Sequence, residues 1–141
     1  MTFDQVVEAV LEVLVAGLPT LDPETQIARP NETFDESLVP AGLPYIRVTV
    51  IETASRQQSL GPSGARKWER FGRVVVQTFS PIGTASQSAN QLAESVRALL
   101  EGSRPASQLW FDAAALQPMG PDGQAWFQIN VNAPFRYQQT H

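Results

Sequence analysis

The sequence predicts an α+β fold, in which a mostly antiparallel sheet of about four strands has two helices packed on one face. Two segments place apolar residues at helical spacing, and four others alternate or cluster apolar residues as strands do. Their order is helix, irregular N-terminal arm, strand, strand, helix, strand, strand. A chain of 141 residues, 43% of them hydrophobic, is long enough for one core, so we expect residues 1–141 to form a single domain.

The first helix is predicted between Thr2 and Gly17. Thr2 is followed three residues later by Gln5, which is the pattern of a capping box. Gly17 and Pro19 end the segment, because neither residue continues a helix well. One face carries the apolar residues Phe3, Val6, Val7, Val10, Leu11 and Leu14.

Residues 18–44 predict an irregular arm around a short extended piece at Gln26–Arg29. Five prolines interrupt this segment, and so long a connection in a small domain tends to contact partners. The spacing of its acidic residues matches no calcium-binding loop, so we predict an acidic surface and no metal site. These acids are Asp22, Glu24, Glu32, Asp35 and Glu36.

Residues 45–53 and 67–79 predict the two strands of a hairpin, because apolar and polar side chains alternate in both. The connection at residues 54–66 is rich in Gly, Ser and Gln and is much longer than a two-residue turn. We expect such a tip to be mobile in a free subunit and to become ordered against a partner.

The segment SPIGTAS, residues 80–86, leads into a second helix that ends at Gly102. Pro81 and Gly83 predict a structural turn, with Thr84 or Ser86 as the helix cap. The amides of a helix N-terminus suit a phosphate, but the segment lacks the lysine of a P-loop and the three glycines of a dinucleotide fold. We therefore interpret it as a hinge of the scaffold. The apolar face of the helix comprises Ala85, Ala89, Leu92, Ala93, Val96, Leu99 and Leu100.

Residues 108–117 and 124–139 predict the last two strands, joined by a second hairpin loop at residues 117–124. Pro134 predicts an edge or a bulge, because proline has no amide proton to donate to a ladder. The last strand also presents an uncharged polar face, which either packs against a neighbouring subunit or is exposed to solvent. This face comprises Gln128, Asn130 and Asn132.

The composition argues against catalysis and against a cofactor. Cysteine is absent, which removes thiolate nucleophiles and Cys-based metal sites, and the only histidine is the last residue, His141. A small hydrolase using Asp112, or using Glu52 and Glu69 facing each other across the hairpin, is the catalytic alternative. Carboxylates on strands are more often surface ion-pair partners, so we predict no enzyme, no cofactor and no metal.

The sequence contains no segment that predicts insertion into a membrane. The N-terminal segment carries acids where a signal peptide carries bases. No apolar run approaches the roughly 20 residues of a membrane span, so we expect synthesis in the cytosol.

Charge is uneven along the chain, whose net charge is −4. Residues 1–36 hold eight acids and one base, whereas residues 37–141 hold six acids and nine bases. Four of these bases lie close together in the sequence: Arg66, Lys67, Arg70 and Arg73. They are interpreted as a solvated basic strand or as one end of a bipolar surface that meets a complementary surface on another subunit. A nucleic-acid-binding module is a further alternative, although the acidity of the whole chain argues against it. That alternative would use Arg56, Arg66, Lys67 and Arg70 with Trp68.

Three stretches of the sequence form a recognisable set: the hairpin tip QQSLG, the ending VNAPFRY at residues 131–137, and a central motif. The central motif comprises Arg70, Gly72, Val74, Val76, Phe79, Pro81, Gly83, Leu92, Ala93 and Val96. With these stretches, most of residues 44–137 resembles the phage tail terminator family. Members often carry a further glycine after the Pro-Gly turn, where this chain has Thr84 and Ala85.

The resemblance implies a structural virion protein that forms a ring, usually of six subunits, at the head-proximal end of a long phage tail. Such a ring ends polymerisation of the tail tube and joins the tail to head-completion proteins. The implied partners are other copies of the chain, the major tail tube protein, a head-completion or stopper protein and the tape measure protein. DNA only passes through the lumen, and no membrane is involved. Another head–tail connector or tail tube subunit of related fold is the alternative.

Within this expectation, we predict that the hairpin contacts a neighbouring subunit or the tail tube. Its long polar side chains can donate to and accept from a neighbour, and its arginines can reach carboxylates. The predicted contact residues are Arg56, Gln57, Gln58, Arg66, Lys67 and Arg70, while Pro81 and Gly83 serve the turn alone.

Overall fold

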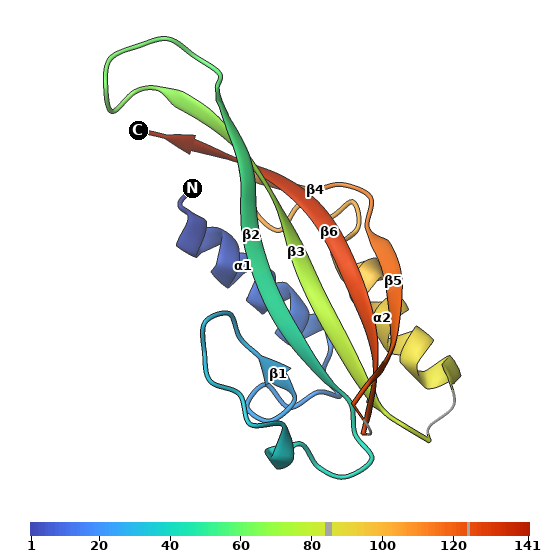
Figure 1. The fold of residues 1–141 in the computed structure, drawn as a ribbon. Coiled ribbons are helices and arrows are strands. Elements are labelled where there is room, and N and C mark those ends of the chain that lie inside the picture. The colour runs from blue at the N-terminus through green and yellow to red at the C-terminus, as the bar shows by residue number, and fades with distance from the viewer. Residues whose placement is uncertain (84–85, 124) are drawn as a thin grey trace.

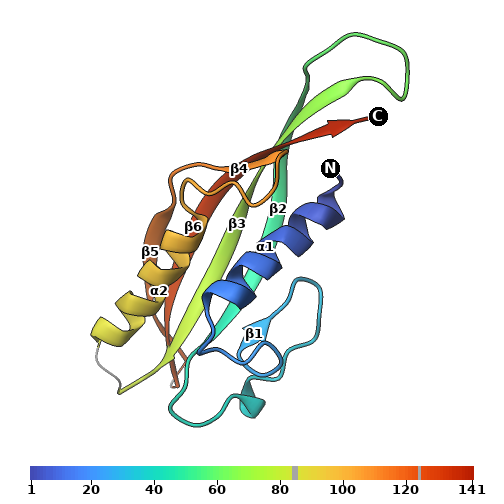
Figure 2. The same cartoon turned by 180° about the vertical axis from the view of Figure 1, so that it is seen from behind.

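The computed structural model describes residues 1–83, 86–123 and 125–141. Within these ranges the α+β class is confirmed, with α1 and α2 lying on one face of a single sheet (Figures 1 and 2). In chain order the elements are α1 (Phe3–Gly17), β1 (Ile27–Ala28), a 3-10 helix (Glu36–Leu38), β2 (Tyr45–Gln57), β3 (Lys67–Pro81), α2 (Ser86–Leu100), β4 (Leu109–Phe111), β5 (Ala115–Asp122) and β6 (Trp126–Thr140).

The sheet is mixed and six-stranded in the described part of the chain, with the order β1-β2-β3-β6-β4 and with β5 also paired to β6. Only the short β1–β2 pair is parallel; the other described pairs are antiparallel. The expectation of about four strands was therefore wrong in number. β1 arises from the predicted extended piece of the arm, and β5 arises from a segment predicted in part as a loop.

The division of residues 108–124 differs from the prediction of one strand followed by a loop. β4 ends at Phe111, and β5 begins at Ala115 and continues to Asp122 in spite of two prolines. A register shift between Pro118 and Gly120 lets β5 follow β6 through this part. Pairing with the neighbouring strand β6 therefore decided what the turn-forming residues of this segment did not.

Pro134 occupies the gap between β4 and β5, which corrects the prediction of an edge or a bulge. Its carbonyl accepts from the Asp112 amide at 3.0 Å, on the side of β6 that faces β4 and β5. Because the N and C=O groups of one strand residue point the same way, the Pro134 nitrogen faces the same gap. The missing proton therefore costs no ladder hydrogen bond.

The main core lies between the sheet and the two helices. Val48, Val76 and Val131 face each other across three strands, and each is at most 1% exposed. Gly72 permits close packing here, because a Cβ at this position would meet the Ile51 carbonyl and the Phe135 ring. The helices contribute fully or nearly fully buried residues at helical spacing: Val6, Val10 and Leu14 from α1, and Ala89, Ala93, Val96 and Leu100 from α2.

The predicted helix ends are partly confirmed. Thr2 accepts from the Gln5 amide at 3.3 Å, and the Gln5 side chain accepts from the Thr2 amide at 2.9 Å, which makes the capping box of α1. The caps predicted for α2 rest on Thr84 and on the side chain of Ser86, which lie outside the described part. Gly83 has a φ of +97°, as its place in the turn predicts.

A second, smaller cluster anchors the arm to the opposite face of the sheet. Tyr45 stacks on Phe79 at 4.6 Å between ring centroids and on Phe34 at 5.1 Å. The Tyr45 hydroxyl also donates to Glu36 at 3.0 Å. The acidic arm is thus held in place by aromatic packing at one end of this face, and the rest of the face stays open. The predicted polar residues Gln128, Asn130 and Asn132 lie on it, each half-buried.

Candidate subunit-contact site

The hairpin projects beyond the helical layer, together with the end of β6 (Figure 1). β2 continues to Gln57, past the predicted end at residue 53, because Ser55, Arg56 and Gln57 still pair with β3. A register shift between Glu52 and Ala54 precedes this pairing. The shift sets Arg56 opposite Glu69, and Gln138 of β6 lies on the other side of Glu69.

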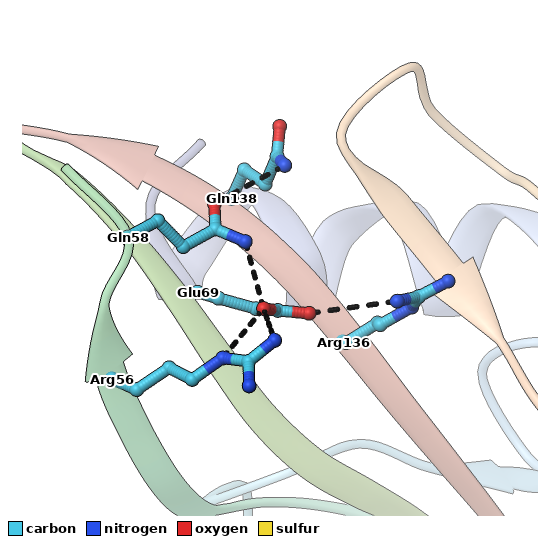
Figure 3. Close-up of polar contacts among 5 residues, drawn as sticks. All are labelled: Arg56, Gln58, Glu69, Arg136 and Gln138. Carbon is cyan, nitrogen blue, oxygen red and sulfur yellow. Dashed lines mark hydrogen bonds and ion pairs between the residues drawn. The ribbon is translucent and has the colours of Figure 1, made fainter.

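Glu69 is the centre of a polar cluster on the open face of the hairpin (Figure 3). Its Oε2 accepts from Arg56 at 2.9 Å and 2.6 Å and from Gln58 at 2.7 Å. The Arg136 guanidinium lies 3.5 Å from Oε1, and the Gln138 amide donates to Gln58 at 3.4 Å. Glu69 itself is only 4% exposed. We call these five residues the Glu69 cluster: Arg56, Gln58, Glu69, Arg136 and Gln138.

The Glu69 cluster favours the charged form of its carboxylate. Hydrogen bonds from Arg56 are the largest cause that lowers the pKa of Glu69, and the charge of Arg56, the Gln58 hydrogen bond and the charge of Arg136 add to it. Burial acts in the opposite direction but is outweighed. The cluster thus joins β2, β3 and β6 through a shared anion.

The helix-side face of the hairpin carries a different set of contacts, centred on Arg70. Its guanidinium donates to Ser55 and to Gln139, both at 3.0 Å, and lies 5.3 Å from the centroid of the Trp68 ring. His141 stacks on Trp68 with 5.9 Å between the ring centroids, and its Nε2 lies 3.1 Å from the Arg70 guanidinium. Arg70 is therefore held by its own subunit.

Tyr137 closes this face toward the core. Its hydroxyl donates to Glu52 at 2.9 Å. Burial, with the Glu52 hydrogen bond and charge, raises the pKa of Tyr137 to about 12. The predicted facing pair of Glu52 and Glu69 was wrong, because Glu52 pairs with Gly72 and strand alternation places the two carboxylates on opposite faces of the hairpin.

The tip itself is stabilised mainly by local hydrogen bonds. Gln57 donates to the Ser59 carbonyl at 2.8 Å, Arg66 donates to the Gly61 carbonyl at 2.7 Å, and the Lys67 amide donates to the Ser59 hydroxyl at 2.9 Å. Leu60 stands out from this loop with 94% of its surface exposed.

The six predicted contact residues therefore do not form one patch. Arg56 and Gln58 lie in the Glu69 cluster, Arg70 lies on the opposite face, and the other three lie at the tip. Arg56 therefore lies on another face of the hairpin than Trp68 and Arg70, with which the nucleic-acid alternative groups it. Sequence reasoning missed the roles of Glu69, Arg136 and Gln138, because only the strand register brings them to Arg56 and Gln58.

The remaining candidates for chemistry do not come together. Asp112 is exposed in the break between β4 and β5. Across the described ranges, no group of three or more His, Cys, Asp or Glu side chains is arranged to hold a metal ion. Neither described helix has the length and apolar character needed to cross a membrane.

Two comparisons with known proteins find matches to this chain. A family model described as phage tail terminator protein matches residues 5–135. Among solved structures 28 chains match, and one of them covers 100% of this chain and 98% of its own length, with a TM-score of 0.67 and 23% identity, which shows a shared fold. No curated protein sequence matches the chain. Because the family model spans nearly all of the sequence, the chain belongs to the phage tail terminator family, whose members are structural proteins of the phage tail and not enzymes.

Proposed function

We propose that the protein forms a ring of six subunits at the head-proximal end of the phage tail. There it ends polymerisation of the tail tube and joins the tail to a head-completion or stopper protein. The number six is the one that the family resemblance implies. The observation that carries the proposal is the hairpin, which extends past the core of its own subunit (Figure 1). Membership of the terminator family supports the same role.

The Glu69 cluster gives the hairpin the stiffness that such a contact needs. Arg56 and Gln58 from β2, Glu69 from β3 and Arg136 from β6 bind one another where the helices no longer support the sheet. A strand pair without a core is marginally stable in water, so this polar cluster replaces part of the missing apolar packing. The projecting element is held in one direction, which lowers the entropy cost of docking.

The proposed contact is heterologous, because the hairpin of one subunit meets a different surface on the next. Such contacts close into a ring when the rotation between subunits allows it, and otherwise they continue as a filament. A closed ring ends tube growth because it offers no further copy of its own interface. The proposed contact residues toward a neighbouring subunit or the tube remain Arg56, Gln57, Gln58, Arg66, Lys67 and Arg70.

The test is assembly of the purified chain, alone and with the major tail tube protein of the same phage. Analytical ultracentrifugation and negative-stain electron microscopy should show closed rings, and adding them to polymerising tube protein should shorten the tubes. Long tubes formed by this chain alone would assign it to the tube. Rings that leave tube length unchanged but bind heads would assign it to another connector position.

A further inference from the structure

The outer surface of α1 carries a groove at the edge of the core. The fully buried residues of α1 are Val6, Val10 and Leu14, and the groove follows the neighbouring stripe, whose apolar residues Leu11 and Val15 pack only partly against the core. Its volume is about 470 Å³, and Leu11 and Val15 provide a half-buried apolar floor. The lining residues are Glu8, Leu11, Glu12, Val15 and Ala16 from α1, and Arg29 from the arm.

The groove is acidic along its helix side. Glu8 and Glu12 are exposed one helical turn apart, and Asp4 continues the same charge toward the N-terminus. α1 carries no base between Phe3 and Gly17, and Arg29 is the only base in the groove lining. The groove therefore fits an apolar side chain accompanied by positive charge.

The hairpin tip has the complementary character. Leu60 is the most exposed of the large apolar residues in the described part, at 94%, so its side chain gains by burial elsewhere. Arg66 and Lys67 follow on the return side of the tip, where Arg66 turns back to the Gly61 carbonyl at 2.7 Å. The Lys67 side chain is exposed and has no ion-pair partner within the described residues.

The tip and the groove of one chain cannot meet. β2, β3 and β6 carry the tip away from the helical layer, and Figure 2 shows α1 running from the N-terminus in the opposite direction. The Glu69 cluster holds these strands together, so the tip does not fold back onto its own helix. A second copy of the chain is the occupant whose charge and apolar content match.

We propose that Leu60 of one subunit inserts between Leu11 and Val15 of the next, while Arg66 and Lys67 pair with Glu8 and Glu12. This inference rests on the proposed assembly and names the surface that accepts the hairpin. The contact is heterologous, so each subunit offers one tip and one groove.

Because the chain has no cysteine, disulfide cross-linking can report this contact without background. We would mix Leu60→Cys protein with Val15→Cys protein under mild oxidation and measure the disulfide-linked dimer on a non-reducing gel. The matched control replaces Val15→Cys by Asn90→Cys, which lies exposed on α2, a helix of the same 15-residue length as α1. We expect a cross-link with Val15→Cys and at most a trace with Asn90→Cys.

Charge reversal tests the pairing by a second route. Arg66→Glu/Lys67→Glu protein and Glu8→Lys/Glu12→Lys protein should each associate roughly tenfold or more weakly than the wild type, because like charges then face each other. Mixing the two variants should restore association. The acidic tip of one variant then meets the basic groove of the other, and the unchanged basic tip meets the unchanged acidic groove. Glu24→Lys/Glu32→Lys protein has the same change in net charge at exposed arm positions and should associate normally.

The outcomes separate this inference from the proposed function. Rings without the Val15→Cys cross-link, or rings unaffected by either charge reversal, would overturn the tip–groove contact and leave the ring standing. A cross-link in long tubes would support the contact and reject the terminating ring. Absence of both association and cross-linking in folded protein, checked by circular dichroism, would reject both.

Discussion

Glu69 is a buried acid, and its burial depends on the residues that bind its carboxylate. A carboxylate at 4% exposure needs hydrogen bonds or a counter-ion, and Arg56, Gln58 and Arg136 supply them. The partners are themselves more exposed, with 67% of the Arg56 side chain and 48% of the Arg136 side chain in solvent. If Glu69 is replaced, these arginines should therefore become hydrated by solvent and not remain buried without a partner.

The first prediction concerns the acid stability that Glu69 contributes. Its pKa in the folded protein lies below the ordinary value of 4.5, so this contribution is present above pH 4.5 and is lost as the pH falls through the folded value. In Glu69→Gln protein the free energy of unfolding at pH 7 should fall by about 1–3 kcal/mol. The difference from the wild type should shrink steadily below pH 4.5.

Urea unfolding at a series of pH values between neutrality and strong acid measures this. Glu94→Gln is the matched control, because Glu94 pairs with Arg97 on an exposed helix surface and should contribute less than about 1 kcal/mol. A difference from the wild type that stays constant across the acid range would show that the Glu69 carboxylate is not the titrating group.

The second prediction concerns Gly83 in the turn before α2. Its φ of +97° belongs to a region that β-branched residues rarely adopt, and no heavy atom lies within 4 Å of a Cβ placed there. Gly83→Val should therefore destabilise the fold by backbone strain alone, by about 1–3 kcal/mol. Gly61→Val, at a tip glycine without positive φ, should leave the melting temperature nearly unchanged. Equal melting of Gly83→Val and the wild type would show an ordinary turn.

At the scale of elements, the hairpin combines two parts with different roles. Up to Gln57 and Trp68 it is a paired strand ladder, fixed by the Glu69 cluster on one face and by Arg70 on the other. Beyond Gln58 and Lys67 the chain makes a loop that adds nothing to the core. The fold should therefore tolerate a change in the loop, whereas assembly should not.

The third prediction follows from this division. Replacing Ser59–Arg66 by a two-residue Asn-Gly turn keeps Gln58 opposite Lys67, where the Gln58 amide already donates to the Lys67 carbonyl at 2.8 Å. The shortened subunit should retain its circular dichroism spectrum and melt within a few degrees of the wild type. It should fail to form rings and fail to join tails to heads in a complementation assay.

The control keeps the loop length and replaces Ser63→Ala, at a tip residue that is exposed. This variant should assemble normally. Infectious particles in normal yield from the shortened protein would contradict a role of the tip in assembly.

At the scale of the whole molecule, charge is separated between surfaces. Asp4, Glu8 and Glu12 on α1 carry negative charge on the helix side. The open face of the sheet carries Arg47 and Arg73, both exposed. A chain with this separation can bring opposite charges together between copies, which favours one orientation of association over others.

The fourth prediction is that ring assembly depends on salt. Raising the ionic strength from 0.1 M to 1 M shortens the Debye length from about 10 Å to about 3 Å, so charge pairs between exposed surfaces weaken. At high salt the ring should therefore dissociate at a higher protein concentration, as measured by sedimentation. The melting temperature of the subunit should change little. Tighter association at high salt would indicate that apolar burial dominates the interface.

Much of the fold was predictable from local patterns. The 3.6-residue spacing in α1 and α2, the alternation in β2, β3 and β6, and the Pro-Gly turn each carry their signal within a few neighbouring residues. The capping box at Thr2 and the positive φ of Gly83 are local in the same way. The family was also recognisable, because its motif lies in the continuous stretch that forms β3 and α2.

Only the tertiary structure decided the features that depend on strand pairing. Residues 117–122 became a strand because β6 offered an unpaired edge, although their prolines and glycine favour a turn. The register shift after Glu52 placed Arg56 against Glu69, whereas strand alternation placed Glu52 on the other face beside Tyr137, so two carboxylates expected to face each other lie apart. A spacing along one strand determines which side chains share a face, but the partners across the sheet are set by register. Register follows from hydrogen bonds and packing across the sheet, which the pattern along a single strand does not encode.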